Sequence, residues 1–575
     1  MSKVVKLSIK NFRKFKHFET VFGMRDTICL IGRGDSGKST ILDAISYCLS
    51  PSWNIPIFDY DFCDCNVSES IEICATVVDF PEGLMNSTKY GLYCSGWNPA
   101  QQKVVDATDD ECMPALQIML TIGASLEPKW EVVNHTSNER TQISAQDRAQ
   151  LKVFMVSDYV NNHFAWANGS PLNSLSRVAG ESLNVEALLA IMRQIRASCK
   201  DIQFGDFSTL FPMIERQASE LGLATGRVSP AFDMKRLAVK EGTVCLHDAN
   251  DLPLRLMGKG SKRLMSVAIQ AAVSEGKGVI LIDEIEQGLE PDRIRHLVHS
   301  LGKSISCQVF FTTHSNEALV EMDAENVFWL KNTAGAISLS KEVQGLVRNN
   351  PSAFFAKRVV LCEGKTECGF IQTLGRFFCE RGGHPPLAEI GVAVVDGGGS
   401  HFAEYAKELQ QLGVPFLLFC DSDEEAANAR KEAIGRMGIC VVDWEDQDAF
   451  EQGIYKELPD AGIRDLNELA LKLKCRMDGM SEAEARQSML DTVRKYEKTI
   501  TPEMLFAPNA SFTASTRQSL GKASKGKKDG GGAWFKSTTG GMLVGEIICR
   551  YYADLPSTGY VRGNLDAIEK WLYGV

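Results

Sequence analysis

The sequence predicts a multidomain α/β protein with two separate parallel sheets and a helical C-terminal extension. Three observations support this fold class. The chain has 575 residues, enough for about three or four domains. A short apolar strand, a glycine-rich loop and a helix follow one another over Thr27–Leu49. Strands then alternate with helices over Arg358–Val442, and the pattern is helical from Asp460 onward.

Composition and charge limit the classes of protein that fit. Hydrophobic residues make up 44% of the chain, which excludes a mainly disordered protein. The sequence has no run of 18 apolar residues and no signal-peptide pattern, so we expect a cytoplasmic protein with no membrane partner. None of the 17 cysteines forms a CxxC pair, which argues against a zinc site. The net charge of −11 means that nucleic acid must be bound by a local basic patch or by metal ions on carboxylates.

A phosphate-binding loop is predicted after the strand Thr27–Ile31. Gly32–Ser39 fits the pattern GxxxxGK[ST] and leads into a helix. In such loops the backbone N–H groups surround a phosphate, and the start of the helix adds partial positive charge. We expect Lys38 to reach the β- and γ-phosphates of ATP and Ser39 to bind Mg²⁺. The nucleotide-binding residues predicted here are Gly32, Gly34, Gly37, Lys38, Ser39 and Thr40.

The ends of two later strands complete the predicted ATP site. The strand Val279–Ile282 runs into Asp283 and Glu284. We expect Asp283 to hold Mg²⁺ through water and Glu284 to polarise the attacking water. His314 follows the next strand, where it is placed to contact the γ-phosphate.

These motifs resemble those of ABC-type ATPases of the RecF and SMC kind. The resemblance includes the opening strand with Asn11-Phe12-Arg13. The chain between the phosphate-binding loop and the acidic pair is longer than a compact core needs, so an insertion is expected, with Val185–Leu223 as its helical part. The resemblance implies that this ABC/SMC-like ATPase forms a homodimer or a higher oligomer, helped by the helical insertion.

In such dimers a signature loop of one subunit covers the ATP of the other. Gly258–Arg263 occupies the expected place, just before a helix, and Gly260 is the predicted nucleotide contact. The serine usual in the signature is replaced by Gly258 or Lys259. The sequence therefore supports ATP binding more strongly than hydrolysis across the dimer.

Acidic residues are predicted to meet at one edge of the second sheet. Glu363 follows the strand Arg358–Cys362, and Glu367 lies one helical turn further on. Asp421 and Asp423 follow another strand of the same sheet, and the carboxyl ends of parallel strands share an edge. Because four carboxylates repel one another, we expect a divalent metal, and oxygen ligands favour Mg²⁺ or Mn²⁺, with Ca²⁺ as an alternative.

A strand followed by Glu-Gly, and later Asp-x-Asp, resembles a Toprim domain, the metal-dependent module of topoisomerases, primases and certain nucleases. The turn Asp396–Gly399 falls where that fold has a glycine-rich turn. An ABC-type ATPase followed by Toprim resembles the OLD (overcoming lysogenisation defect) family of nucleases. That family includes the nuclease subunit of the Gabija anti-phage system and effectors associated with retrons.

The family resemblance implies an ATPase-coupled DNA endonuclease that uses two metal ions and acts in bacterial defence. It implies that Glu367 and Glu451 hold the second metal and that Lys536 assists. The predicted catalytic residues are Glu363, Asp421, Asp423 and Lys536, together with Glu284 in the ATPase. The partner is a helicase, a reverse transcriptase with its DNA product, or none.

Five segments are predicted. The ATPase occupies residues 1–150 and 236–348, with the helical insertion at 151–235. Toprim occupies 349–455, and a helical part with a flexible basic loop occupies 456–575. The loop, Ser519–Gly532, either follows a phosphate backbone or is a plain linker; its lysines are Lys522, Lys525, Lys527 and Lys528.

Two rival functions share parts of this pattern. A topoisomerase needs a tyrosine nucleophile in a separate domain, and a primase usually contains a zinc module. The sequence indicates neither the tyrosine domain nor the zinc module. A non-cleaving ATP switch of the SMC kind would use Toprim only to bind nucleic acid. The complete set of acids argues against that switch.

Overall fold

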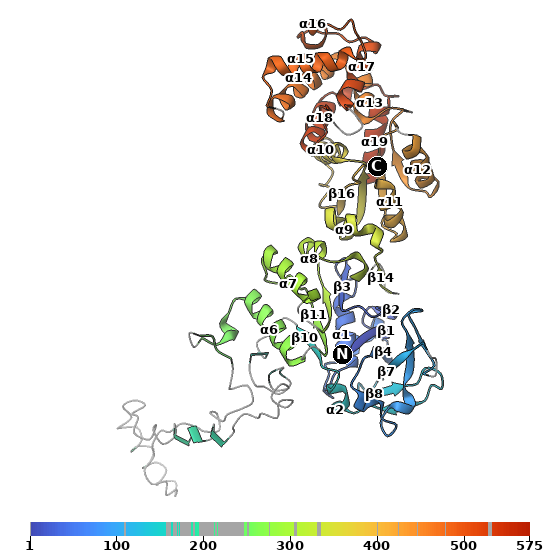
Figure 1. Ribbon diagram of the computed structural model, residues 1–575, viewed down its shortest axis with the longest axis vertical. Helices are drawn as coiled ribbons and strands as arrows, with labels where there is room; N and C mark the ends of the chain where they lie inside the picture. Colours follow the sequence, from blue (N-terminus) through green and yellow to red (C-terminus); the bar gives the residue numbers. More distant parts are fainter. Residues whose placement is uncertain are drawn as a thin grey trace. The chain divides into compact units, whose positions relative to one another are not determined.

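A computed structural model describes residues 2–107, 111–156 and 252–574, with short gaps in the last range. The gaps are 275–276, 304–306, 331–334, 400, 424, 446, 478 and 527–531. Between residues 157 and 251 it describes only scattered positions, so the insertion predicted at Val185–Leu223 lies outside the described residues apart from isolated ones. The chain divides into two compact units (Figure 1): residues 1–28 with 39–311, and residues 29–38 with 312–575. Within the described ranges, no helix is long and apolar enough to cross a membrane.

An eight-stranded antiparallel sheet forms much of the first unit. Its strand order is β2-β1-β4-β7-β5-β6, and β8 pairs with β7 and β9. In the first strand Val5, Leu7 and Ile9 are buried while the residues between them are less so, the alternation typical of a sheet with one covered face. The strands are β1 (Lys3–Phe12), β2 (Phe15–Val21), β4 (Ile71–Val78), β5 (Ser95–Asn98), β6 (Lys103–Val105), β7 (Met113–Ile122), β8 (Pro128–Val133) and β9 (Arg140–Gln142).

A second sheet contains the strands of the predicted ATPase core, in the order β10-β11-β12-β3-β13-β14. Its strands are β10 (Val153–Val156), β11 (Val279–Ile282), β12 (Gln308–Thr312), β3 (Thr27–Gly32), β13 (Val327–Leu330) and β14 (Ile337–Ser338). β10, β11 and β12 run parallel, as do β3 and β13. All residues of β3 and β11 are buried, as expected for parallel strands covered on both faces. The helices are α1 (Lys38–Cys48), α2 (Ala145–Ala149), α6 (Lys259–Ser274), α7 (Pro291–Lys303), α8 (Asn316–Val320) and α9 (Gln344–Asn349).

The predicted strand–helix alternation after residue 357 is confirmed as a four-stranded parallel sheet. Its order is β16-β15-β17-β18, and the register places Cys362 at the end of β15 beside Asp396 on β16 and Phe419 on β17. The carboxyl ends of three strands therefore meet at one level. The strands are β15 (Arg358–Cys362), β16 (Val392–Asp396), β17 (Phe416–Phe419) and β18 (Cys440–Val442); the helices are α10 (Lys365–Gly382), α11 (Phe402–Gln411) and α12 (Glu425–Arg436).

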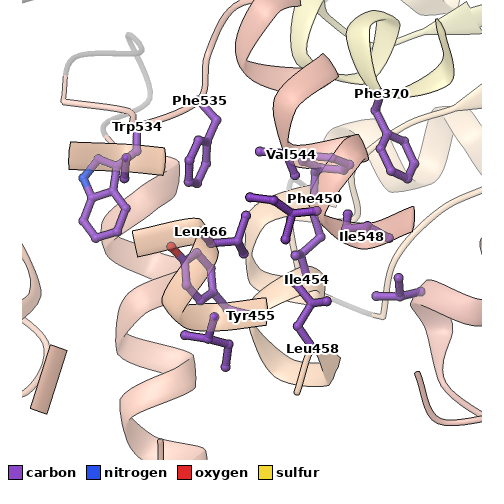
Figure 2. Close-up of a cluster of buried hydrophobic side chains, with 14 of the residues drawn as sticks. Phe370, Phe450, Ile454, Tyr455, Leu458, Leu466, Trp534, Phe535, Val544 and Ile548 are labelled. Atoms are coloured by element: carbon purple, nitrogen blue, oxygen red, sulfur yellow. The ribbon is translucent and has the colours of Figure 1, made fainter. Parts of the chain in front are cut away.

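Seven more helices share one hydrophobic core with this sheet. Figure 2 shows Phe370 of α10 near Phe450 of α13, with Val544 and Ile548 of α18 in the same cluster. Helix α19 reaches back to the sheet: the Arg358 guanidinium donates hydrogen bonds to the carbonyls of Trp571 and Leu572 at 2.9 and 2.8 Å. The helices are α13 (Phe450–Glu457), α14 (Asp460–Met477), α15 (Glu482–Arg494), α16 (Pro502–Phe506), α17 (Ala514–Lys525), α18 (Thr538–Arg550) and α19 (Tyr560–Tyr573).

The stretch Ser519–Gly532, predicted as a flexible loop, begins as a helix. Helix α17 continues to Lys525, and its small residues are buried against α13. A Cβ added at Gly521 would lie 2.8 Å from the Cα of Gln452, so glycine permits this close approach. The small side chains therefore serve helix packing, which composition alone does not distinguish from flexibility. Residues 527–531 of this stretch lie outside the described residues.

Candidate functional site

The phosphate-binding loop follows β3 in the predicted position. A Cβ at Gly32 would lie 2.7 Å from Ser36 Oγ and 2.9 Å from the Leu330 carbonyl oxygen, so only glycine fits there. The buried Lys38 side chain turns back into the loop, where Nζ donates hydrogen bonds to the carbonyls of Gly32 and Arg33 at 3.0 and 3.1 Å. The Lys38 ammonium group therefore lies inside the loop, where a phosphate-binding loop places it.

Two predicted magnesium ligands are hydrogen-bonded to each other. Ser39 Oγ, on α1, donates to Asp283 Oδ1 at 3.0 Å, at the end of β11. Thr40 follows and is buried. Glu284 is exposed and has a φ of 48°, a left-handed conformation that is uncommon for a residue other than glycine and typical of functional positions.

The predicted signature stretch, Gly258–Arg263, was expected just before a helix but lies almost entirely within one. Helix α6 begins at Lys259, so Gly260 lies within its first turn. A Cβ at Gly260 would collide with the Gly288 carbonyl, which explains the glycine by close packing. His314 lies two residues after the end of β12, close to the predicted position, and is exposed.

The acidic residues of the four-stranded parallel sheet accept hydrogen bonds from backbone N–H groups of the same site. Glu363 directly follows β15, and its Oε2 accepts a hydrogen bond from the Asp421 N–H at 2.9 Å. Asp421 Oδ1 in turn accepts one from the Phe450 N–H, at the start of α13, also at 2.9 Å. The glycine turn after β16 closes over β15, since the Gly399 N–H donates to the Glu363 carbonyl at 2.8 Å. The ends of β15, β16, β17 and α13 therefore meet at one place.

Burial and mutual repulsion shift the pKa values of three of these carboxyl groups in one direction. Burial, reinforced by repulsion from Glu451 and Glu363, raises the pKa of Glu367 to about 8. Burial also raises the pKa of Asp421 well above its usual range, and the charges of all four other acids add to the rise. Burial raises the pKa of Glu451 as well, while attraction to Lys536 and Lys525 opposes that rise. The site thus holds five mutually repelling carboxyl groups next to two lysines.

A divalent metal fits the chemistry of this group. All donors are carboxylate oxygens, the ligands that Mg²⁺ and Mn²⁺ prefer, and a cation would relieve the repulsion. In the described part of the chain, no three His, Cys, Asp or Glu side chains are already spaced to hold a metal.

One lysine that the sequence assigned only to a loop lies in this site. Lys525, at the end of α17, forms an ion pair with Asp423. Burial alone would lower the pKa of Lys525, but its hydrogen bond and attraction to Asp423 raise it above the usual value. Lys536 is exposed and follows Phe535, and its charge acts on Glu451.

Comparisons with known families match three parts of the chain. Residues 3–140 match an AAA ATPase domain, and residues 180–321 match an AAA domain described as a putative AbiEii toxin of a type IV toxin–antitoxin system. Residues 354–423 match the Toprim domain of overcoming-lysogenization-defect-like proteins. Endonuclease GajA of Bacillus cereus (strain VD045) is 22% identical over 473 residues, covering 75% of this chain and 77% of the relative. The chain is thus similar to the ATPase–Toprim nucleases of the OLD family.

Solved structures similar to this chain include an Smc head domain and the recombination mediator RecF. One is the Smc head domain from Pyrococcus furiosus, bound to the C-terminal domain of ScpA; it is 14% identical, with a TM-score of 0.31, covering 60% of this chain and 97% of that one. The other is the recombination mediator RecF with ATP, also 14% identical, with a TM-score of 0.33, covering 59% and 99%. At these TM-scores, the description of the fold rests on the strands and family matches of the chain itself.

The matched OLD-like Toprim range contains Glu363, Glu367, Asp421 and Asp423, whereas Glu451 and Lys536 lie beyond it. Sequence reasoning missed a buried network behind the two aspartates of this OLD-like Toprim domain. Ser422 is fully buried, and its Oγ accepts hydrogen bonds from Lys431 Nζ at 2.6 Å and from the Trp444 N–H at 3.2 Å. The same Oγ donates to the Trp444 carbonyl at 2.7 Å, and Lys431 also pairs with Asp443 at 2.7 Å. A lysine on an amphipathic helix carries no signal that would have revealed this role.

Proposed function

We propose that this chain is an ATPase-coupled, divalent-metal-dependent DNA endonuclease that acts in bacterial anti-phage defence. The observation that carries the proposal is the meeting of five carboxyl groups at the carboxyl ends of β15 and β17, in an OLD-like Toprim domain. The 22% identity to a protein named as an endonuclease supports it. The proposal places the protein in the cytoplasm, with DNA as its substrate.

In the proposed reaction, water is added across a phosphodiester bond. Glu363, Asp421 and Asp423 would hold one divalent ion, and Glu367 and Glu451 would hold the second. When bound, these ions polarise the water and the phosphate and stabilise the departing oxygen. The side chain of Lys536 would neutralise the negative charge that develops on the phosphate.

We propose that the N-terminal half binds ATP with Mg²⁺. Lys38 would contact the β- and γ-phosphates, with the loop glycines Gly32, Gly34 and Gly37 allowing the backbone to approach them. Ser39 and Asp283, already hydrogen-bonded to each other, would share the metal. The remaining residues of this proposed site are Thr40, Gly260, Glu284 and His314.

The test measures plasmid cleavage and ATP hydrolysis on the same purified variants, in Mg²⁺ or Mn²⁺, with and without ATP. Asp421→Ala should abolish cleavage and keep ATP hydrolysis, because it removes a metal ligand without touching the ATP site. Glu432→Ala is the matched control, an exposed acid on α12 paired with Arg436 away from the cluster. Cleavage by Asp421→Ala at the wild-type rate would overturn the proposed nuclease site. DNA retention without any cleavage by the wild type would favour the non-cleaving switch.

A further inference from the structure

The ion pair between Lys525 and Asp423 joins the last residue of α17 to one of the proposed metal ligands. The Asp423 side chain is 12% exposed and that of Lys525 is 36% exposed, so the contact is largely removed from solvent. An ion pair of this kind is only partly screened by water, and a competing cation must displace the ammonium group from the carboxylate.

The backbone around Lys525 is fixed by packing. Helix α17 lies against α13, which carries Glu451, and the approach is made possible by Gly521. The preceding residue, Ser524, is fully buried, and its carbonyl accepts a hydrogen bond from the Trp534 N–H at 2.9 Å. The end of α17 is therefore held in place, and only the flexible side chain of Lys525 is able to move.

A divalent ion and an ammonium group cannot share Asp423 without repelling each other. Lysine carries its charge on a flexible four-carbon stem with rotatable donors, which suits a group that changes partner. Asp421 and Glu451, whose charges also act on Lys525, are themselves proposed metal ligands. Once metal has bound these acids and Asp423, the negative group left for Lys525 is a phosphate of the DNA that the site is proposed to bind. Lys522, one turn earlier on α17, is exposed and does not share this position.

We infer that Lys525 is a second lysine of the nuclease site: it occupies Asp423 in place of metal and contacts the DNA phosphate once metal has bound. This role rests on the proposed nuclease function and is separate from that of Lys536. Two consequences distinguish it from a structural ion pair. Removing the charge of Lys525 strengthens metal binding, and it weakens the interaction of the metal-loaded site with DNA.

The test compares Lys525→Met, which keeps most of the stem and removes the charge, with Lys522→Met as the matched control. Mn²⁺ binding is titrated calorimetrically in the absence of DNA. Lys525→Met should bind Mn²⁺ about fivefold more tightly than the wild type, as expected when one partly exposed ion pair no longer competes. At saturating Mn²⁺ its KM for DNA should rise severalfold. Lys522→Met should match the wild type in Mn²⁺ binding, and Lys407→Met, at an exposed position of α11, should match it in both measurements. Unchanged or weaker Mn²⁺ binding by folded Lys525→Met overturns the inference.

Lys525→Arg keeps the test decisive if Lys525→Met is unstable. A guanidinium group pairs more firmly with a carboxylate, so Lys525→Arg should bind Mn²⁺ more weakly than the wild type, and equal or tighter binding overturns the inference. The proposed nuclease function fails separately. If the wild type never cuts DNA but Lys525→Met binds Mn²⁺ more tightly, the competition for Asp423 is upheld and the nuclease is overturned. If the wild type cuts, Asp421→Ala does not, and Mn²⁺ binding is unaltered in Lys525→Met, only the inference about Lys525 is overturned.

Discussion

At the scale of single residues, Ser422 shows how an uncharged side chain holds two acids in place. Its hydroxyl uses its one donor and both acceptor sites on Trp444 and Lys431, which leaves it no alternative orientation. The turn that carries Asp421 and Asp423 is thereby fixed from its buried side. Groups that orient metal ligands in this way commonly matter nearly as much as the ligands themselves.

Lys431→Met should therefore weaken metal binding or cleavage by about 10–100-fold, because Ser422 and Asp443 lose their shared partner. ATP hydrolysis should stay at the wild-type level. The measurement is Mn²⁺ affinity together with cleavage rate. Lys407→Met, which changes an exposed lysine on α11, serves as the control. Wild-type values for Lys431→Met in both assays would show that the Ser422 network does not position the acids.

The ATP site gives a second prediction at this scale. Lys38→Ala removes the buried ammonium group from the loop and should lower ATP hydrolysis by at least about 10²-fold, together with nucleotide affinity. Glu284→Gln should bind ATP and fail to turn it over. The check is nucleotide binding by calorimetry and phosphate release on both variants. An ATPase rate for Lys38→Ala equal to that of the wild type would mean that the ATP site is misassigned.

Sequence reasoning placed Glu363, Asp421 and Asp423 at one sheet edge because Glu363 follows one strand and the two aspartates lie in the turn after another. The structure brings these three together, and Glu367 and Glu451 with them. The ion pair of Lys525 was not predictable, because it joins residues about a hundred positions apart on elements whose packing only the folded chain defines. The network of Ser422 was missed although its partners Lys431 and Trp444 are near in sequence, because a serine in a turn and a lysine on a helix carry no pattern that pairs them.

At the scale of elements, α17 shows where composition misleads. A stretch rich in glycine, serine and lysine is typical of a linker, yet its first half is a helix packed on α13. Glycine and serine favour flexibility when they are exposed, but in a buried interface they allow two helices to approach closely. By contrast, every strand and helix of the four-stranded parallel sheet was predictable from apolar runs and their spacing, because parallel strands leave a strong pattern.

Gly521→Leu should separate α17 from α13, because the new side chain would collide with the backbone of Gln452. Overpacking of this kind costs about 1–3 kcal/mol of folding free energy. We expect a lower melting temperature and slower DNA cleavage, since Lys525 and Glu451 lie on the two displaced helices. Gln518→Leu, at an exposed position of α17, is the control. Equal melting temperatures for the two variants would contradict the close packing inferred here.

At the scale of the whole molecule, the net charge of −11 sets a condition on DNA binding. The overall field repels DNA, so attraction must arise locally, from bound metal ions and from lysines next to the carboxylates. The same group of acids that would hold the ions would repel DNA without them. Divalent metal should therefore be required for DNA binding as well as for cleavage.

Assembly gives the prediction at this scale. The proposed ATPase would complete its site across a homodimer or a larger assembly, with Gly260 of one copy covering the nucleotide of another. Size-exclusion chromatography with light scattering at micromolar concentration should show at least a dimer, with Glu284→Gln plus ATP giving the most complete association. A monomer under every condition, including Glu284→Gln with ATP, would contradict this assembly.

The bonds from Arg358 to the carbonyls of Trp571 and Leu572 have a consequence for synthesis on the ribosome. Chains emerge from the N-terminus at about 5–20 residues per second, so the strand that precedes Glu363 appears well before the helix that it must contact. Glu451, Lys525 and the core around α18 are also translated later than Asp421 and Asp423. In a nascent chain, Asp421 and Asp423 are therefore synthesised before the helices that hold them in place. The proposed metal site is therefore ordered only when translation of this half is nearly complete.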